Sequence, residues 1–160
     1  MDKYFVKQDE LENIRKKYKA AKIVLTSGCF DLIHEGHIKH LQEAKKQGDI
    51  LIVAVNSDYS IKRLKGKGKP ILNEEQRLTI IASIRFVDYV YLFDSVNVVD
   101  SINILKPDVF VIGQESVILF PEEVNSAKEC GCKIHVVKRI NSYSSSNIIK
   151  KIKTEVKIEN

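Results

Sequence analysis

Five short apolar runs alternate with segments of helical pattern along the 160 residues of the chain. The runs are KIVLTS, DILIVAV, YVYLF, DVFVIG and KIHVV. They are rich in β-branched residues and apolar throughout, which predicts strands that are buried on both faces. The segments between them predict helices over 36–46, 73–83, 96–105 and 121–130. This alternation predicts an α/β domain in which a five-stranded parallel sheet, joined by right-handed crossovers, carries helices on both faces.

Both ends of the chain are expected to add a helix to this core. Leu11, Ile14 and Tyr18 recur at helical spacing in an otherwise charged stretch, which predicts an amphipathic helix that covers the sheet. Near the other end, three consecutive serines can cap a final lysine-rich helix. A chain of this length has room for one domain of ordinary size. We therefore expect a single domain made of an N-terminal helical extension, a core and a tail, over 1–21, 22–152 and 153–160.

Ligands of an open parallel sheet bind beyond the carboxyl ends of its strands, where the winding direction reverses. The loops that follow the five predicted strands span 27–37, 56–72, 93–95, 113–121 and 138–146. The formal net charge is +5, and the second of these loops holds five basic residues separated by two glycines. The five are Lys62, Arg63, Lys65, Lys67 and Lys69. Charge gathered in this way predicts one anion site rather than a broad basic face.

The start of the chain, MDKYFVKQDELENIRKKYK, is charged and lacks the apolar core of a signal peptide. No later run approaches the roughly eighteen apolar residues that a membrane span needs. The three cysteines, Cys29, Cys130 and Cys132, are odd in number, which predicts free thiols. Cys130 and Cys132, followed by His135, do not match the usual zinc spacing. We expect a cytoplasmic protein that binds neither a membrane nor a structural metal.

The most informative loop follows the first predicted strand and reads SGCFDLIHEGH. It ends in a His-x-Gly-His unit, His34 to His37, where a helix is predicted to begin. Unpaired backbone N–H groups and the positive end of a helix dipole favour polyphosphate at such a turn. Gly36 allows a ligand to approach the backbone closely. Histidine pairs also begin many metal sites or serve in capping, so the pair alone leaves the function open.

The sequence resembles the cytidylyltransferase-like nucleotidyltransferases, which are related to the catalytic domain of class I aminoacyl-tRNA synthetases. The resemblance is carried by GCFDLIHEGH, NSDYSIKRLKGKGKPILNEEQR, IRFVDYVYLF and SYSSSNIIKKI, which follow one another in this order within residues 22–152. It implies a single Rossmann-like, doubly wound domain that transfers a nucleotidyl group from a nucleoside triphosphate to a phosphorylated small molecule and releases pyrophosphate. A homodimer is expected from the resemblance, and because two-fold dimers are the commonest oligomers.

Two parts of the family are represented. The segment from Lys62 to Gly66, with Pro70, is most similar to the heptose 1-phosphate adenylyltransferases, which make ADP-heptose for surface polysaccharide. Those enzymes carry Lys-Gly-Gly-Asp-Tyr after strand four, where this chain has IGQES. Arg139 lies five residues ahead of Ser144, and an arginine at this position is instead similar to the glycerol-3-phosphate cytidylyltransferases, which carry one before a Ser-Thr-Thr helix start. The resemblance therefore implies a heptose 1-phosphate adenylyltransferase, with a CTP-dependent cytidylyltransferase of glycerol 3-phosphate or a related alcohol phosphate as the alternative.

Such a transfer needs groups that stabilise charge. An acceptor phosphate with a second pKa of about 6 is already ionised near neutrality, so no general base is required. The resemblance implies that the catalytic residues are His34, His37, Lys62 and Lys65, with both lysines in a mobile, glycine-containing loop. It implies nucleotide binding by Gly28, Cys29, Phe30, Gly36, Gly113, Arg139, Ser144, Ser145 and Ser146. It implies substrate binding by Asp31 and Arg77. Gln114, where the sequence departs from the family, is expected to bind substrate because it follows the fourth predicted strand, at the rim of the site. Mg²⁺ is expected to arrive on the triphosphate, without a dedicated protein site.

Several of these residues also have an ordinary structural interpretation, and three other classes of protein are alternatives. The serines can simply cap a helix, the basic loop can be solvated, and Arg77 can be a surface arginine. An NAD-binding domain would need Gly-x-Gly-x-x-Gly after the first strand, which is missing. A nucleic-acid-binding module would explain the basic loop but not His34 and His37. A third alternative is a catalytically inactive regulator that binds a nucleotide. Release of pyrophosphate would distinguish an enzyme from such a regulator.

Overall fold

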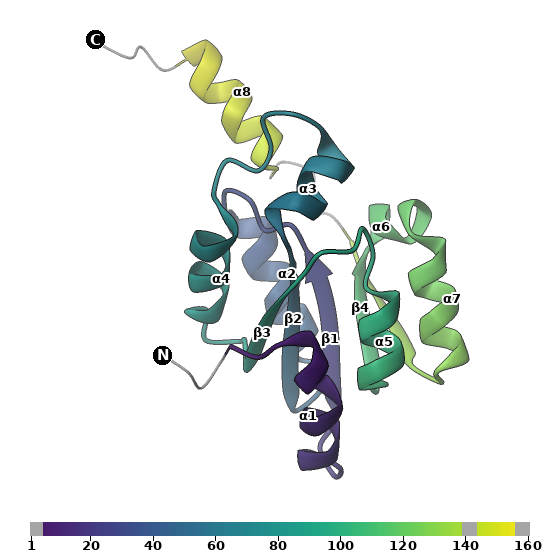
Figure 1. Ribbon diagram of the computed structural model, residues 1–160. Coiled ribbons are helices and arrows are strands. Elements are labelled where there is room, and N and C mark those ends of the chain that lie inside the picture. Colours follow the sequence, from purple (N-terminus) through teal and green to yellow (C-terminus); the bar gives the residue numbers. More distant parts are fainter. Residues whose placement is uncertain (1–4, 139–143, 156–160) are drawn as a thin grey trace.

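The computed structural model describes residues 5–138 and 144–155 and contains the predicted parallel sheet (Figure 1). Its strands are β1 (Ile23–Gly28), β2 (Ile50–Asn56), β3 (Tyr89–Phe93), β4 (Val109–Gly113) and β5 (Lys133–Val137). Their order is β3-β2-β1-β4-β5, and neighbouring strands are parallel. The chain winds from β1 to one edge, then returns past β1 to build the other. The winding direction therefore reverses between β1 and β4, where a ligand is expected to bind.

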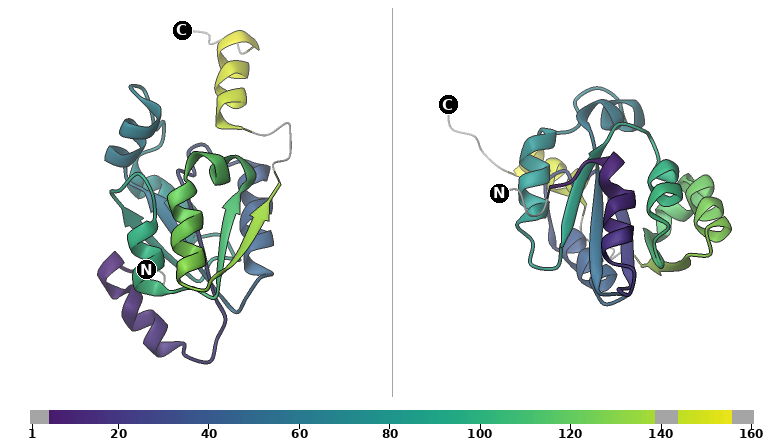
Figure 2. Two further views of the ribbon diagram at one scale, coloured as in Figure 1. Left: turned by 90° about the vertical axis from the view of Figure 1, so that its right-hand side faces the viewer. Right: turned by 60° about the horizontal axis from the view of Figure 1, so that its bottom comes forward.

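Helices cover both faces of this sheet, as predicted (Figure 2). One face carries α1 (Leu11–Lys17), α5 (Val99–Leu105), α6 (Gln114–Leu119) and α7 (Pro121–Glu129). The other carries α2 (Glu35–Lys45) and α4 (Glu74–Ala82). Successive strand residues point to opposite faces, so Leu25 joins the first core and Val24 the second. Among the described residues, no helix combines the length and the apolar character that a bilayer crossing requires.

Two helices were missed by the sequence analysis: α3 (Asp58–Lys65) and α6. α3 lies within the segment expected to be a glycine-containing loop. It begins because the Ser57 side chain accepts the N–H of Ser60, and it ends at Gly66, whose φ is 83°. The last helix, α8 (Ser145–Glu155), runs past the predicted end of the core at residue 152. α5 begins at Val99, later than predicted.

The N-terminal extension covers the sheet as predicted. Leu11 and Ile14 of α1 are buried in the first core, and the hydroxyls of Tyr18 and Tyr89 are 2.7 Å apart. Ahead of α1, a 3-10 helix spans Gln8–Glu10. Still earlier, the N–H of Val6 donates to the carbonyl of Val90 on β3, at 3.1 Å. The extension therefore also protects part of an exposed strand edge.

Glu123, in the first turn of α7, is a buried carboxyl. Its side chain is 3% exposed, and Oε1 accepts the N–H of Val98 at the start of α5, at 3.0 Å. The pKa of Glu123 is raised to about 7, mainly by burial and to a lesser extent by the neighbouring Glu122, while the hydrogen bond from Val98 opposes the rise. The carboxyl is therefore protonated in the folded state at pH values where it is ionised in the unfolded chain.

We expect Glu123→Gln to remove a pH dependence of stability. Because the folded-state pKa is raised, the contribution of Glu123 to stability is fully present below about pH 4.5 and is lost as the pH rises to about 7. The loss is on the order of 3 kcal/mol. Urea unfolding at pH 5 and pH 8 measures it, with the exposed Glu129→Gln on the same helix as the control. Equal pH dependence in wild type and Glu123→Gln would contradict the prediction.

Candidate active site

The turn between β1 and α2 brings His34 and His37 together at the reversal point of the sheet. His34 is the N-cap of α2, with extended backbone angles, and His37 lies in the first turn. The two rings stack with centroids 3.9 Å apart and planes inclined by 28°. The edge of the Phe30 ring supports His37 at a centroid distance of 5.5 Å. The predicted pair thus forms one rigid unit at the end of the central strand.

Both imidazoles accept a backbone hydrogen bond at Nδ1. The N–H of Gly36 donates to His34 at 3.1 Å, and the N–H of His34 donates to His37 at 3.4 Å. A neutral imidazole that accepts at Nδ1 carries its proton on Nε2. Each ring therefore presents an N–H on the side away from the helix end. The sequence predicted that backbone N–H groups contact the anion directly, whereas the N–H of Gly36 is already bound by an imidazole.

The electrostatic surroundings keep His37 neutral. Burial, helped by the nearby His34, His40 and Lys65, lowers the pKa of His37 to about 3. Beneath the pair, Nε2 of His40 lies 2.8 Å from Thr26 Oγ1, and the Thr26 hydroxyl donates to the carbonyl of Val111. α2 is in this way fastened to both central strands. His37 can act as a neutral hydrogen-bond donor, but not as a cation near neutral pH.

The loop ahead of His34 is held in a strained conformation. Phe30 and Leu32 have φ values of 51° and 47°, which residues other than glycine rarely adopt. A Cβ atom on Gly28 would lie 3.1 Å from the Phe30 ring, so a larger residue at this position would require the ring to shift from the end of β1. Asp31, between the two strained residues, is 4% exposed. The strand end and the histidine pair are therefore joined by a loop that the surrounding structure fixes.

The carboxylate of Asp31 binds backbone rather than facing solvent. Its two oxygens accept the N–H groups of Ile71 and Leu72, each at 2.9 Å. Its carbonyl accepts the hydroxyl of Ser145 at the start of α8. Asp31 thus ties together the histidine loop, the segment after the basic residues and the final helix. This geometry favours a role in positioning the loop over the predicted contact with substrate.

Lys65 is an exposed residue whose positive charge acts on the histidine turn. Burial raises the pKa of the Cys29 thiol, and the Lys65 ammonium opposes that rise through a hydrogen bond and its charge. The same ammonium lowers the pKa of His37. Lys62 is exposed on the same helix. Both lysines were predicted in a loop, and the structure corrects this: they lie on α3, and the loop begins only at Gly66.

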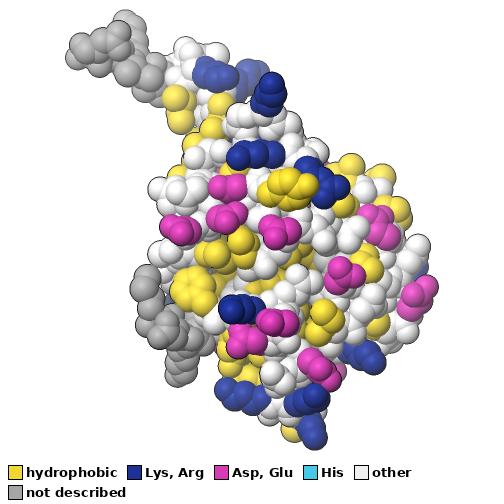
Figure 3. Space-filling model, viewed as in Figure 1, with side chains coloured by type: hydrophobic (Ala, Val, Ile, Leu, Met, Phe, Trp, Pro, Cys, Tyr) yellow, Lys and Arg dark blue, Asp and Glu magenta, His cyan; other side chains and the backbone are white. Residues whose placement is uncertain are grey.

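The other residues predicted to bind nucleotide or substrate lie at the start of α8 and at the end of β4. Ser144 caps α8, with Oγ accepting the N–H of Asn147 at 3.1 Å, and Ser146 is exposed on its first turn. Figure 3 shows the basic side chains of α3 and α8 gathered at one end of the molecule. Gly113 ends β4, and Gln114 is exposed as the first residue of α6. Arg139 lies outside the described residues.

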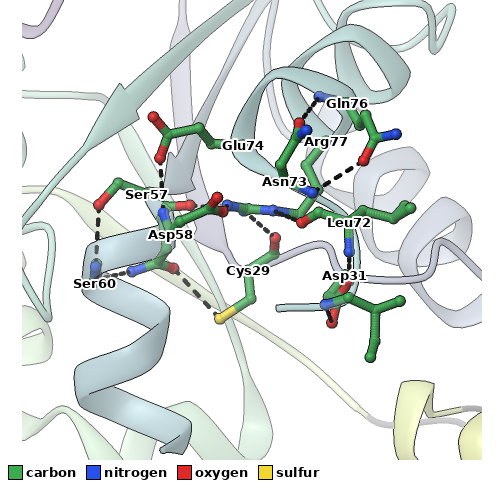
Figure 4. Close-up of polar contacts among 12 residues, drawn as sticks. Cys29, Asp31, Ser57, Asp58, Ser60, Leu72, Asn73, Glu74, Gln76 and Arg77 are labelled. Atoms are coloured by element: carbon green, nitrogen blue, oxygen red, sulfur yellow. Dashed lines mark hydrogen bonds and ion pairs between the residues drawn. The ribbon is translucent and has the colours of Figure 1, made fainter. Parts of the chain in front are cut away.

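Arg77 is not at the surface of the site. Its side chain is fully buried, with 0% exposed, and its guanidinium binds three backbone carbonyls and Asp58 (Figure 4). The sequence predicted that Arg77 binds the phosphate of the acceptor. The geometry favours a positioning role instead, because a phosphate could reach these N–H groups only after the bonds that bury them had been broken.

Residues 25–151 match the family described as cytidylyltransferase-like. The chain belongs to this family. Similar proteins are the bifunctional protein HldE of Campylobacter jejuni subsp. doylei, 40% identical over 95% of this chain, and that of Helicobacter pylori, 45% identical over 89%. The chain spans only 32% and 30% of their lengths. The family and these relatives indicate a nucleotidyltransferase, as the sequence predicted.

Solved structures with the same fold agree with this assignment. A lipopolysaccharide core biosynthesis protein from Thermoplasma volcanium is 31% identical, with a TM-score of 0.63 over 78% of this chain and 100% of its own. A pantoate-beta-alanine ligase from Francisella tularensis has a TM-score of 0.67 over 91% of this chain and 72% of its own. Its identity is 18%, so it supports the cytidylyltransferase-like fold alone.

Sequence reasoning missed the residues that hold this cytidylyltransferase-like site in shape. Asp58 binds Arg77 at 2.8 Å, and Glu74 accepts the N–H of Asp58 at 2.8 Å. One local signal was present: Ser57 followed by Asp58 is a typical helix start, and Gly66 a typical helix end. No local signal pairs Asp58 with Arg77, because that contact joins two helices.

The neutral state of His37 can be tested by NMR. With a pKa of about 3, the imidazole should keep its proton on Nε2 from pH 8 down to pH 5. The ¹⁵N shifts of a labelled sample report the protonation state of both ring nitrogens over this range. His135 on β5 gives an internal comparison in the same spectra. A His37 titration midpoint near 6.5 would show that the ring becomes a cation in this range.

Proposed function

We propose that this chain is a heptose 1-phosphate adenylyltransferase that acts in the synthesis of a surface-polysaccharide precursor. The observation that carries the proposal is the stacked histidine pair, whose Nδ1 atoms are both occupied by backbone N–H groups at the reversal point of the sheet. Similarity to HldE proteins and to a lipopolysaccharide core biosynthesis protein supports the sugar phosphate as acceptor.

The proposed reaction is a single displacement at the α-phosphorus of ATP. A phosphate oxygen of the acceptor forms a bond to this phosphorus, and the bond to the bridging oxygen of the β-phosphate breaks. Pyrophosphate leaves with the electron pair of the broken bond. The acceptor is already largely ionised near neutral pH, so the protein has no proton to remove. This agrees with a site that offers donors and cations, since His37 is buried and neutral.

In this proposal the Nε2–H groups of His34 and His37 donate to phosphate oxygens and stabilise charge in the transition state. Lys65 adds a positive charge beside them, and Lys62 binds phosphate from the exposed side of α3. The nucleotide-binding residues complete the site around the triphosphate. They are Gly28, Cys29, Phe30, Gly36, Gly113, Arg139 and the serines at 144–146. In this proposal Asp31 positions the histidine loop, and Gln114 faces the base or the acceptor.

Magnesium belongs to the proposal as part of the MgATP substrate. Within residues 5–138 and 144–155, no group of three histidine, cysteine or acidic side chains could hold a metal ion. The carboxylate of Asp31, next to the histidines, uses both oxygens for backbone N–H groups. The ion therefore fits as a companion of the triphosphate, bound by phosphate oxygens and water.

A second candidate is a CTP-dependent cytidylyltransferase of glycerol 3-phosphate or a related alcohol phosphate. The observation that favours it is Gln114, which follows Gly113 at the start of α6 and is exposed at the end of β4. The heptose enzymes carry another sequence at this point, so the base or the acceptor can differ.

One experiment tests the proposed function and ranks these candidates. ATP, CTP, GTP and UTP are each incubated with heptose 1-phosphate and with glycerol 3-phosphate, and pyrophosphate release is measured with magnesium present. We expect ATP with heptose 1-phosphate to give the highest kcat/KM. A higher value for CTP with glycerol 3-phosphate would select the second candidate. Nucleotide binding without pyrophosphate from any pair would indicate a regulator.

Gln114→Asp is expected to change the ranking of substrates more than it changes the best kcat. Glutamine can donate and accept a hydrogen bond, whereas an ionised aspartate can only accept. Gln114 is exposed in the absence of ligand, and a polar group that a bound ligand covers without pairing it costs roughly 1–3 kcal/mol, or about a tenfold to hundredfold change in selectivity. The same matrix of nucleotides and acceptors measures it, with the exposed Glu129→Gln as control. An equal decrease for every pair would assign selectivity to other residues.

The homodimer and the cytoplasmic location predicted from the sequence are also part of the proposal. Neither a membrane nor a nucleic acid takes part in the reaction. Light scattering coupled to size-exclusion chromatography measures the mass of the particle directly. A mass near twice 18.3 kDa supports the dimer, and a mass near 18.3 kDa contradicts it.

A further inference from the structure

The guanidinium of Arg77 joins three stretches of the chain, which hold Cys29, Asn56 with Asp58, and Leu72. Nη1 donates to the carbonyl of Cys29 at the end of β1 and to that of Asn56 at the end of β2, each at 2.7 Å. Nε donates to the carbonyl of Leu72 at 3.0 Å. Nη2 donates to Asp58 Oδ1 at 2.8 Å. Figure 4 shows this guanidinium lying between Asp58 and Leu72.

These bonds fix the start of α3. Asp58 is the first residue of that helix, and its N–H is bound by the Glu74 carboxylate at 2.8 Å. α3 is therefore fastened to α4 through both the side chain and the backbone of one residue. An α-helix of eight residues is a stiff rod roughly 12 Å long, so fixing its first turn restricts where its last residue can lie.

The last residue of that rod is Lys65, an exposed residue at the end of α3 that precedes Gly66 and the following loop in sequence. Its positive charge acts on the histidine turn, because it opposes the rise in the pKa of the Cys29 thiol and contributes to the low pKa of His37. Arg77 holds the carbonyl of the same Cys29. One buried guanidinium thus fixes both the strand end that carries Cys29 and the helix that carries Lys65.

We infer that Arg77 and Asp58 are a positioning pair that sets the ammonium of Lys65 against the histidine pair. Arg77 does not touch the substrates in this arrangement; it acts through the orientation of α3. The inference deepens the proposed function, on which the catalytic role of Lys65 rests. The placement of Lys65 itself can be measured without turnover, so the two can fail separately.

The first test uses the Cys29 thiol as a reporter of Lys65 in the full chain. Alkylation of Cys29 by iodoacetamide is followed over a pH series by mass spectrometry of its peptide. Lys65→Ala should raise the thiol pKa by about half a unit or more, because a nearby cation is lost. Asp58→Asn keeps the shape of the side chain and removes its charge. If it releases α3, it should raise the same pKa, although loss of a nearby negative charge alone would lower it.

The double variant decides between positioning and an independent effect. With Lys65→Ala already present, Asp58→Asn should cause no further rise, since no ammonium is left to misplace. Arg63→Ala, which removes an exposed arginine from the same helix, is the control and should leave the thiol pKa unchanged. An unchanged or lowered pKa in the single Asp58→Asn variant would overturn the inference, whatever the activity of the protein.

Kinetics provide the second test. Arg77→Lys and Asp58→Asn should each lower kcat by about tenfold in the wild-type background and by less than about twofold with Lys65→Ala. If Arg77→Lys does not fold, Asp58→Asn still tests the pair, because Arg77 keeps its three carbonyl partners. Effects that multiply independently in the double variants would overturn the inference. Absence of pyrophosphate release from wild type would reject the proposed function, and the thiol measurement would still stand.

Discussion

His37→Ala is expected to lower kcat for pyrophosphate release by about a hundredfold or more while the protein stays folded. The replaced ring is a neutral donor held in place by Phe30, His34 and a backbone N–H. Loss of one such donor to a transition-state oxygen costs roughly 3–4 kcal/mol, which corresponds to about a hundredfold to a thousandfold in rate. Steady-state kinetics with saturating nucleotide and acceptor measure the effect.

His34 needs a substitution that separates catalysis from helix capping. His34→Asn retains a good N-cap acceptor for α2 but removes the Nε2–H group. We expect unfolding close to that of wild type and a loss of kcat comparable to that of His37→Ala. His135→Gln, a histidine change on the edge strand β5, is the control and should keep full turnover. Near wild-type turnover in both His34→Asn and His37→Ala would rule out the donor mechanism.

The largest effect on stability is expected for Arg77→Met. The methionine fills part of the space but leaves three carbonyls and the Asp58 carboxylate without their donor. Removing one partner of a buried charged group costs about 3–5 kcal/mol. In a chain of this size that corresponds to a decrease in Tm on the order of 10 °C.

Urea unfolding at fixed pH, followed by circular dichroism, measures the change for Arg77→Met. The control is Arg85→Met, because Arg85 is exposed and contacts only the face of Phe86 among the pairs that the structure describes. Its cost should stay below about 1 kcal/mol. Similar unfolding midpoints for Arg77→Met and wild type would mean that the guanidinium does not hold the strand ends together.

The sheet could be predicted because burial on both faces leaves a local trace in the sequence. Val53 and its neighbours in β2 are fully buried, and a run of such residues is visible without any knowledge of partners. α3 could not be predicted in the same way, because its lysines and the glycines after it suggested a loop. The N-cap at Ser57 was the one local signal that favoured a helix.

The histidine pair was found from the sequence, but its chemical state was not. The position of its protons depends on two backbone N–H groups and on burial, which only the three-dimensional structure gives. Arg77 shows the same limit. Its partners include carbonyls at Cys29 and Asn56, which are 48 and 21 residues away in the chain. Whether an arginine on a helix meets solvent or a strand end cannot be deduced from helical spacing.

The occupied Nδ1 atoms also bear on which metals can be kept out of the site. Two adjacent imidazoles would ordinarily attract zinc, copper or nickel, which bind through an unprotonated ring nitrogen. Here the backbone of α2 already uses Nδ1 of both rings, and each neutral ring holds its proton on Nε2. A metal could bind Nε2 only if the proton left that nitrogen. If the proton moved to Nδ1, it would face the backbone N–H that now donates to Nδ1, and that hydrogen bond would be lost. Helix capping therefore makes metal ligation by the histidine pair less favourable.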